Sequence, residues 1–369
     1  MKIMIAELRK NKGISQQELA DVLGVAYQTV SKWETNVTFP DITLLPQLAQ
    51  YFDVSVDELL GLKPLPSLTY IPSEAGLKGY WSERLEYLKR TRDSLWNKDY
   101  LQFLIEKVWK IDNPVNILDC GCGYGFLSSM ILPLMPEGST YTGLDFSENL
   151  INKGREALGS VNNHIRFICD NVLTYESDFK YDFVITQAVL RHVDNPQLFL
   201  EKMVSFTKKG GHLVCVEVNR ELENAGLYIE GMDYDYLCEN PGFRKMWSTE
   251  LERQGRDYSI GMKIPHMMRQ LGVKDIDIRM SDKISFISPE SYNYNEKMTD
   301  FIQAHEFYEN KTDAWRTRAI DRFMNHGMDR KDAEHYCNKQ NQMTDFIRHN
   351  RETLAYTHLY GLLISFGTI

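Results

Sequence analysis

The chain has 369 residues, of which 43% are hydrophobic and 25% are charged, and its formal net charge is −9. This length predicts two domains or one large domain, and the composition is typical of a soluble globular protein. The acidic balance argues against a general nucleic-acid coat, although a local basic face is compatible with it.

No apolar run approaches the roughly 20 residues that span a bilayer, and the first residues lack the apolar region of a signal peptide. We therefore expect no membrane association and a cytoplasmic protein with reduced thiols. The six cysteines are scattered: Cys120, Cys122, Cys169, Cys215, Cys238 and Cys337. Cys120 and Cys122 have no second Cys/His pair at zinc spacing, so we interpret them as packing residues and predict no metal site.

Residues 1–62 contain five short helical patterns with clear start and stop signals. Capping boxes at Ser15–Glu18 and Ser55–Glu58 predict the starts of the second and fifth helices. The third helix is expected from about Tyr27 to Glu34, and it buries Val30 and Trp33.

This segment closely resembles the Cro/lambda-repressor-like (XRE-type) helix-turn-helix family. The resemblance rests on Gln-Glu-Leu-Ala, Leu-Gly-Val, Gln-Thr-Val-Ser-Lys-Trp-Glu and Val-Ser-Val-Asp-Glu-Leu-Leu, in that order. It implies a five-helix DNA-binding domain whose third helix enters the major groove, usually as a dimer on two half-sites. Double-stranded operator DNA and a second copy of the chain are therefore the expected partners.

By position, the resemblance implies these DNA-contacting residues: Gln16, Gln17, Tyr27, Gln28, Thr29 and Lys32. Gln28 suits adenine, and Lys32 suits a phosphate or a guanine. Two departures from the family pattern matter. Ala26 replaces the usual capping serine or threonine, which costs the third helix about 1 kcal/mol, and Tyr27 replaces a frequent arginine. The segment is also slightly acidic, which leaves open a helical domain that binds protein instead of DNA.

Prolines at 64 and 66 predict a linker over residues 63–76. A stretch with helical spacing follows from Tyr80 to Trp96, and a further helix is expected from about Asp99 to Trp109. Tyr80 and Trp81 either cover a ligand pocket or pack between elements, and both interpretations stay open.

The next segment has the pattern of a nucleotide-binding unit. An apolar run, Val115–Leu118, leads into Asp119 and three glycines spaced two apart, and a helical pattern follows. This order predicts a strand, a tight turn and a helix. A second strand closes with Asp145, the position that bonds ribose hydroxyls in such units.

Three more strands are predicted, at Ile165–Asp170, at Phe183–Thr186 ending at Gln187, and at His212–Val218. Helical patterns separate them. Strands that alternate with helices imply a parallel sheet covered on both faces, with ligands at the carboxyl ends of the strands.

These elements resemble the class I S-adenosylmethionine-dependent methyltransferases. The resemblance rests on Leu-Asp-Cys-Gly-Cys-Gly-Tyr-Gly, Gly-Leu-Asp-Phe-Ser, Cys-Asp-Asn, Val-Leu-Arg-His-Val-Asp-Asn-Pro and Lys-Gly-Gly. A dinucleotide-binding oxidoreductase is the competing interpretation of the first two motifs. The acid before the glycines, the aspartate after the third strand, Val-Asp-Asn-Pro and the double glycine favour the methyltransferase.

The resemblance implies S-adenosylmethionine as the cofactor and these cofactor-binding residues: Asp119, Gly121, Gly123, Gly125, Asp145, Phe146, Asp170, Asn171 and Gln187. Asp119 and the glycine backbone would hold the methionyl part. Asp145 would accept the ribose hydroxyls. Phe146 would pack on the adenine, and Asp170 would accept from its amino group. Gln187 would lie beneath the cofactor amino group and face the methyl.

Methyl transfer from a sulfonium is an in-line displacement, for which alignment alone supplies much of the rate. A general base is therefore not obligatory. His192 is the best candidate for one because it follows the fourth strand. The alternative, that its imidazole only bonds nearby backbone, stays open.

The last segment extends the fold. Val273–Met280 and Lys283–Ile287 are expected to form an interrupted sixth strand, and Leu359–Ile369 a seventh. A helical insertion at about 290–350 would cap the pocket or build a dimer surface. Four aromatic residues line a substrate cavity or form an aromatic core: Tyr228, Tyr234, Tyr236 and Trp247.

The overall prediction is a multidomain chain. An all-α five-helix domain (1–62) precedes an α/β Rossmann-like class I methyltransferase (77–369) with a helical insertion between strands six and seven. The tetrapeptide of DNA amino methyltransferases and a Pro-Cys nucleophile are both missing, so the acceptor is expected to be a small molecule methylated on O, N or C. Two hypotheses remain: an active methyltransferase that also regulates transcription, or a transcription factor whose methyltransferase fold is a non-catalytic sensor.

Overall fold

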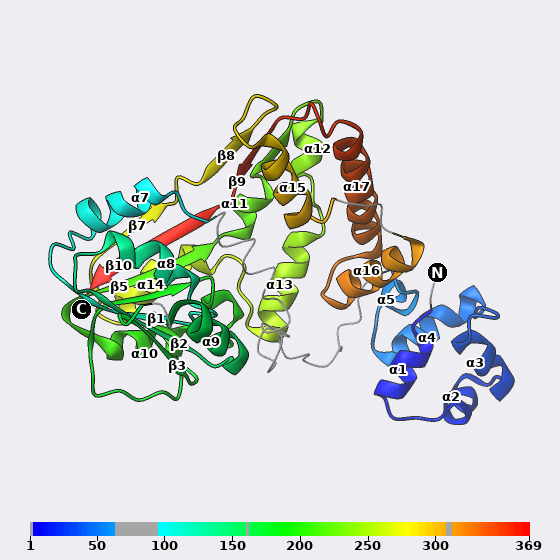
Figure 1. Ribbon diagram of the computed structural model, residues 1–369. Coiled ribbons are helices and arrows are strands. Elements are labelled where there is room, and N and C mark those ends of the chain that lie inside the picture. The colour runs from blue at the N-terminus through cyan, green and yellow to red at the C-terminus, as the bar shows by residue number, and fades with distance from the viewer. Residues whose placement is uncertain (1–2, 63–94, 160–161, 308–311) are drawn as a thin grey trace. The chain divides into compact units, whose positions relative to one another are not determined.

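The computed structural model describes residues 3–62, 95–159, 162–307 and 312–369 (Figure 1). The chain folds as two compact units. Among the described residues, the first unit contains 3–62, 240–253 and 312–346, and the second contains the remainder. The predicted linker, Tyr80 and Trp81 lie outside the described residues, and the domain limits at 62 and 77 stay predictions.

Five short helices open the first unit: α1 (Ile5–Asn11), α2 (Gln16–Leu23), α3 (Tyr27–Glu34), α4 (Leu45–Phe52, after the 3-10 turn η1, Ile42–Leu44) and α5 (Val56–Leu59). Both predicted capping boxes are formed, at Ser15 and at Ser55. Val30 and Trp33 are buried as expected, in a core with Leu19, Leu48 and residues of every other helix. The N-cap of α3, Ala26, makes no side-chain cap bond. The five-helix prediction is therefore confirmed.

Three longer helices complete the first unit: α13 (Phe243–Gln254), α16 (Asp313–Asn325) and α17 (Arg330–His349). They share an apolar core that includes Met246, Phe323 and Met328. Arg330 connects α17 to the end of α5, because its backbone N–H donates to Leu62 O at 3.1 Å and its Nε donates to Gly61 O at 3.0 Å. The predicted helical insertion thus contributes two of its helices to the first unit.

A seven-stranded sheet forms the centre of the second unit. Its strands are β1 (Asn116–Cys120), β2 (Thr140–Asp145), β3 (Ile165–Cys169), β4 (Tyr181–Gln187), β5 (Thr207–Val218), β7 (Lys274–Met280) and β10 (Leu362–Thr368). The order is β3-β2-β1-β4-β5-β10-β7. The pairs among β1 to β5 are parallel, and β10 is antiparallel to both of its neighbours. The strand order reverses at β1 and β4, the place where sheets of this type bind ligands.

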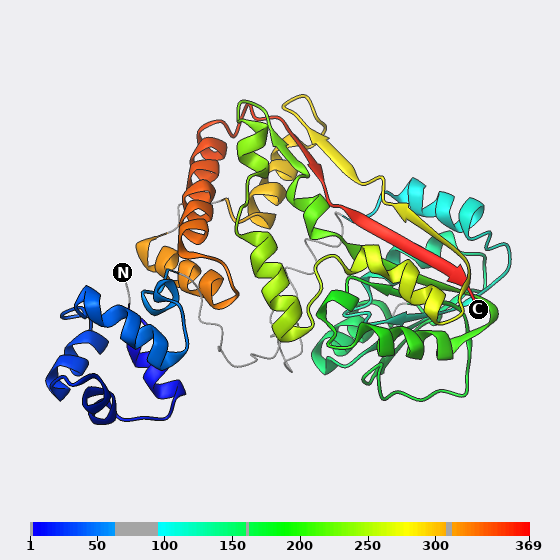
Figure 2. The same ribbon diagram turned by 180° about the vertical axis from the view of Figure 1, so that it is seen from behind.

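Helices cover both faces of this sheet (Figure 1; Figure 2 from behind). They are α7 (Lys98–Phe103, continued by η4, Leu104–Val108), α8 (Phe126–Ile131, continued by η5, Leu132–Leu134), α9 (Glu148–Gly154, continued by η6, Arg155–Gly159), α10 (Pro196–Phe206) and α14 (Ile260–Gln270). Alternate strand residues enter opposite cores because successive side chains of a strand point to opposite faces. Phe183 and Ile185 pack with α7, η4 and α8, whereas Val184 packs with α10 and α14.

A second, three-stranded antiparallel sheet has the order β6-β9-β8, formed by β6 (Leu227–Ile229), β8 (Ile284–Ile287) and β9 (Tyr356–Leu359). The described helices near it in sequence are α11 (Arg220–Asn224), α12 (Tyr234–Cys238) and α15 (Tyr294–Ala304). The prediction that Lys283–Ile287 continues the sixth strand is wrong, because β8 pairs with β9 and not with the large sheet. Period-two patterning cannot show to which sheet a strand belongs.

Along the described residues, no helix has both the length and the apolar character that crossing a membrane requires.

Candidate functional site

A cavity of about 350 Å³ lies at the carboxyl ends of the strands of the second unit. Its wall comes from the residues that follow β1, β2, β3 and β4, and it brings together eight predicted site residues: Asp119, Gly121, Gly123, Asp145, Phe146, Asn171, Gln187 and His192. Gly125 and Asp170 are not part of this wall. The volume is in the range of small-molecule sites.

The glycine turn after β1 is required by its backbone and its close contacts. Gly121, Gly123 and Gly125 have φ of 79°, 58° and 81°. A Cβ on Gly121 would lie 2.6 Å from a methyl carbon of Val189, and one on Gly125 would lie 2.5 Å from the ring of Phe167. Only glycine adopts this conformation in so little space.

The N–H groups of this turn already have protein acceptors. Gly121 N donates to Leu144 O at 2.7 Å, Gly123 N to Asp145 Oδ2 at 2.8 Å and Gly125 N to Cys122 O at 2.9 Å. The turn therefore shapes the cavity and presents carbonyl oxygens, and these N–H groups are not donors to a ligand.

Asp119 ends β1 as a buried carboxylate beside the cavity, 2% exposed. The hydroxyl of Tyr141 donates to its Oδ2 at 2.6 Å. Burial, followed by the nearby Asp119 charge, raises the pKa of Tyr141 well above its ordinary value, so this hydroxyl remains a donor. Sequence reasoning missed Tyr141, because an apolar run that contains a tyrosine gives no sign of a polar partner.

Asp145 ends β2, is 7% exposed and accepts from Gly123 N and from Ser147 N, each at 2.8 Å. Burial raises the pKa of Asp145, although the two backbone N–H groups act in the opposite direction. A carboxylate oxygen accepts more than one hydrogen bond, so each of these oxygens can also accept from a ligand hydroxyl.

The residues after β2 and β3 are more exposed. Phe146 borders the cavity and is 42% exposed, so its ring is accessible to a bound ligand. Asp170 is exposed outside the cavity wall, and its Oδ1 accepts from Asn171 N at 2.7 Å. Asn171 itself borders the cavity, so the structure favours it over Asp170 at this edge.

Gln187, the last residue of β4, is 6% exposed and lines the cavity. Its Oε1 accepts from the indole Nε1 of Trp96 at 2.7 Å. One lone pair of this oxygen is therefore used within the fold, and the place of Gln187 beneath the cofactor amino group stays a prediction. The sequence gives no indication of the pair, whose members are 91 positions apart.

His192 also lines the cavity, but its Nε2 accepts from the Nε of the buried Arg191 at 2.9 Å. A lone pair in a hydrogen bond with a guanidinium is a poor base, because taking up a proton would bring two cations together. The candidate role of general base is therefore not supported at this atom. The alternative that His192 only bonds backbone is also incomplete, because its partner is a side chain.

Glu217 is a site residue that sequence reasoning missed. It lies on β5, is fully buried, and its Oε1 accepts from Val189 N at 2.7 Å and from Leu190 N at 2.6 Å. These bonds fix the turn after β4, where Ala188 has a φ of 55°. Because Val189 packs on Gly121, Glu217 positions one wall of the cavity.

The cysteines beside the cavity are packing residues. Burial raises the pKa of the Cys120, Cys122 and Cys215 thiols well above the ordinary value, so they stay protonated and weakly nucleophilic. Within the described ranges, no group of three or more His, Cys, Asp or Glu side chains is arranged to hold a metal ion.

The predicted substrate-lining aromatics do not border the cavity: Tyr228, Tyr234, Tyr236 and Trp247. Tyr228 contacts Tyr234 edge to face, and Trp247 stacks on Phe243 in the core of the first unit. The interpretation as aromatic packing is therefore the correct one for Trp247.

The predicted DNA-contacting residues lie in α2 and α3. Tyr27, Gln28 and Lys32 of α3 are exposed, and Thr29 is half-buried. In α2, Gln17 is exposed and donates to Asp21 at 2.7 Å.

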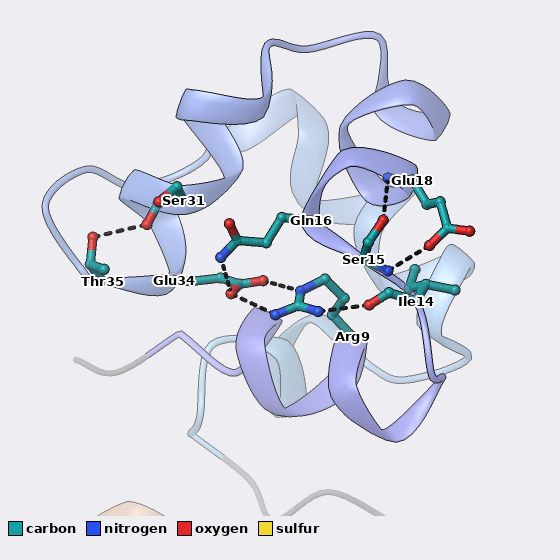
Figure 3. Close-up of polar contacts among 8 residues, drawn as sticks. All are labelled: Arg9, Ile14, Ser15, Gln16, Glu18, Ser31, Glu34 and Thr35. Carbon is teal, nitrogen blue, oxygen red and sulfur yellow. Dashed lines mark hydrogen bonds and ion pairs between the residues drawn. The ribbon is translucent and has the colours of Figure 1, made fainter.

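Gln16 has a structural partner. Figure 3 shows its amide donating to Glu34 Oε2 at 2.7 Å, beside the ion pair in which Arg9 Nε meets Glu34 Oε1 at 2.5 Å. Arg9 also donates to Ile14 O at 2.6 Å. This network joins α1, α2 and α3, and it fixes the orientation of α3 through Glu34.

Comparison with known families assigns both parts of the chain. A family model described as a helix-turn-helix matches residues 5–59, and one described as a methyltransferase domain matches residues 111–255. The chain carries a helix-turn-helix domain and a methyltransferase domain. The second match contains the glycine turn, Asp145, Gln187 and His192, so the cavity belongs to the methyltransferase domain.

Curated relatives match the methyltransferase domain. The ubiquinone biosynthesis O-methyltransferase of Rickettsia felis is 27% identical over 153 residues, which are 37% of this chain and 62% of the relative. That of Coxiella burnetii is 29% identical over 120 residues, 32% of this chain and 50% of the relative. The chain thus spans less than two thirds of these relatives. Among solved structures, a SAM dependent methyltransferase from Aquifex aeolicus is 15% identical, with a TM-score of 0.38 over 54% of this chain and 90% of that chain.

Proposed function

We propose that the methyltransferase domain binds S-adenosylmethionine in the cavity and methylates a small molecule, while the helix-turn-helix domain binds operator DNA. One observation carries the enzymatic part. Asp119, Asp145 and Gln187, at the carboxyl ends of β1, β2 and β4, converge with the glycine turn on one cavity. The switch in strand order that creates such a site is the feature on which nucleotide-type ligands bind in doubly wound sheets.

The donor set fits this cofactor. Asp145 is a buried carboxylate with remaining acceptor capacity for a pair of ribose hydroxyls. Gly121 has no room for a Cβ because Val189 packs against it, and both residues line the cavity. Asp119 supplies the charge that suits an ammonium group, and Phe146 supplies an exposed ring for a base. When bound, S-adenosylmethionine supplies a methyl group made electrophilic by its sulfonium.

The residues of this chain act mainly by alignment and by exclusion of water. Glu217 fixes the turn at Val189 and Leu190, and Val189 of that turn packs against Gly121 and lines the cavity. Holding reactants in line provides much of the rate of a displacement, so the proposal needs no base at His192. The curated relatives are named as ubiquinone biosynthesis O-methyltransferases, which supports a small-molecule acceptor.

The DNA-binding part rests on the helix-turn-helix match and on the exposed side chains of α3. The proposal also includes a homodimer that binds two half-sites and a cytoplasmic location, both of which are expectations from the sequence. Gln28 and Lys32 read or hold the operator, and Gln16 supports α3 through Glu34.

A second candidate function is a sensor that binds the cofactor without turnover. The bond from Arg191 Nε to His192 Nε2 favours it, because the histidine nearest the cavity is engaged in a side-chain pair. Both candidates require cofactor binding, and they differ in product formation.

The test combines three measurements on the full chain. Calorimetry with S-adenosylhomocysteine measures binding, and labelled cofactor with a panel of small hydroxylated and amino metabolites measures turnover. Selection from random duplexes followed by gel shift defines the operator, with Gln28→Ala compared with Gln50→Ala on α4 as the matched control. If S-adenosylhomocysteine does not bind, the enzymatic part of the proposal is refuted. If it binds but no metabolite is methylated, the sensor is selected. Equal operator affinity of Gln28→Ala and Gln50→Ala would refute the role of α3.

A further inference from the structure

The pair of Trp96 and Gln187 fixes the direction of a polar group in the cavity wall. Trp96 is 3% exposed, and its indole nitrogen carries a hydrogen and no acceptor lone pair. Its partner on Gln187, at 2.7 Å, must therefore be the amide oxygen and not the amide nitrogen. The assignment of the Gln187 amide follows from this chemistry.

The remaining end of the amide is Nε2, which has two N–H donors and no acceptor capacity. Among the residues that the structure describes, no protein group accepts from it, although Gln187 borders the cavity. Because this nitrogen is accessible from the cavity, it can donate to a ligand that supplies a lone pair there.

The cavity wall divides into two parts by sequence. Residues after β1, β2 and β3 form the part that fits the cofactor, and residues from Gln187 to Phe199 form the other part. In this second part Asn195 is already engaged, because its Oδ1 accepts from Leu198 N at 3.0 Å. His192 Nε2 is engaged with Arg191. The exposed side chains of Asp194 and Asn195 also border the cavity. Gln187, which is 6% exposed, therefore offers a second ligand a donor from a buried side chain of this wall.

We infer that Gln187, oriented by Trp96, is a specificity residue that selects a methyl acceptor presenting an oxygen lone pair, such as a phenol or an enol, over an amine. The inference rests on the proposed function and names its acceptor class. A donor favours the ionised form of a phenol, since hydrogen bonds to charged groups are the stronger ones. A neutral aryl amine presents N–H hydrogens to this donor and only a weakly accepting lone pair, so it binds less tightly.

Nitrocatechol and the nitrophenylenediamine with the same ring test this inference by equilibrium binding. The full chain is saturated with S-adenosylhomocysteine, so turnover is not needed, and the absorbance of nitrocatechol reports its ionisation. We expect the wild-type chain to prefer nitrocatechol and to shift its absorbance toward the ionised form. Gln187→Glu, which replaces the NH₂ by an acceptor, should weaken nitrocatechol binding about tenfold or more.

Gln187→Met removes the donors without adding charge and should also weaken nitrocatechol binding. Trp96→Phe frees the amide to rotate and should reduce the preference for oxygen. Gln303→Glu, an exposed position on α15, is the matched control and should leave both affinities unchanged. Thermal unfolding confirms that each variant is folded.

The two proposals fail differently. If the wild-type chain does not bind S-adenosylhomocysteine, the proposed function is refuted and the inference with it. If S-adenosylhomocysteine binds, three results refute only the acceptor class. Nitrocatechol does not bind the wild-type chain, it binds Gln187→Glu as tightly as the wild-type chain, or it binds the wild-type chain more weakly than the diamine does.

Discussion

At the scale of single residues, Asp145 combines burial with a task that requires charge. Burial raises its pKa above the ordinary value of 3.8. Before a ligand binds, this group contributes stability that is fully present below the ordinary pKa and is lost as the pH rises through the raised pKa. Ligand hydroxyls that donate to the carboxylate offset this loss.

The consequence is a pH-dependent affinity. We expect the binding of S-adenosylhomocysteine to weaken as the pH falls through the raised pKa of Asp145, because the protonated carboxyl loses acceptor strength. Asp145→Asn should weaken binding by about 1.5–3 kcal/mol and flatten the dependence on pH. Calorimetry from neutral pH downward measures both effects, with the exposed Asp178→Asn as the control. An unchanged pH profile in Asp145→Asn would contradict this role.

At the scale of elements, the start of α3 lacks a side-chain cap. Ala26 has the extended backbone of an N-cap, with φ −71° and ψ 144°, and differs from Ser15 and Ser55 only in having no hydroxyl. We expect Ala26→Ser to stabilise α3 by about 1 kcal/mol. Hydrogen exchange of peptides that cover α3 measures this, and Ser55→Ala is the reverse control, which should lose a similar amount at α5. Faster exchange of α3 in Ala26→Ser would show that the cap cannot form.

The bonds among α1, α2 and α3 also predict acid sensitivity. Burial alone would raise the pKa of Glu34, but the hydrogen bonds from Arg9 and Gln16 and the Arg9 charge outweigh it, and the pKa lies below its ordinary value of 4.5. A lowered folded-state pKa gives stability that is present above the unfolded pKa and is lost as the pH falls through the folded one.

Glu34→Gln should therefore destabilise the helix-turn-helix domain by about 1–3 kcal/mol at neutral pH and make its stability less dependent on pH below about 4.5. Hydrogen exchange of α1 and α3 peptides at several pH values measures this within the full chain. Asp21→Asn removes an exposed carboxylate of α2 and should have little effect. Equal hydrogen exchange in Glu34→Gln and the wild-type chain would mean that the contacts of Glu34 with Arg9 and Gln16 contribute nothing to the stability of the domain.

At the scale of the whole molecule, one chain carries a DNA-binding fold and a cofactor-type cavity. Helix α17 begins at Arg330 beside the end of α5, and its last residues, 347–349, belong to the second unit. Two ligands that bind the same chain and affect each other's affinity do so reciprocally.

We expect S-adenosylhomocysteine to change the affinity for the operator by about fivefold or more, and the operator to change the affinity for S-adenosylhomocysteine by the same factor. Fluorescence anisotropy of a labelled operator, with and without ligand, measures the first, and calorimetry measures the second. Arg330→Ala should reduce this factor, whereas Arg348→Ala near the other end of α17 is the control. A factor of one in the wild-type chain would show that the units act independently.

The sequence by itself determined the local features of this protein. Capping boxes, a glycine turn between strand and helix, and acids at strand ends are signals carried by neighbouring residues, so α2, α3, β1 and β2 were predictable nearly to the residue. The same locality made Asp119, Asp145, Gly121 and Gly123 predictable as residues that line one cavity.

Only the tertiary structure decided which distant residues meet. Trp96 reaches Gln187, Tyr141 reaches Asp119, and Glu217 reaches the turn at Val189. The same holds for β8, whose pattern fitted the large sheet but whose partner is β9. Hydrogen-bond partners separated by many residues leave no periodic signal in the chain, so the sequence could not show that the Gln187 oxygen accepts from Trp96.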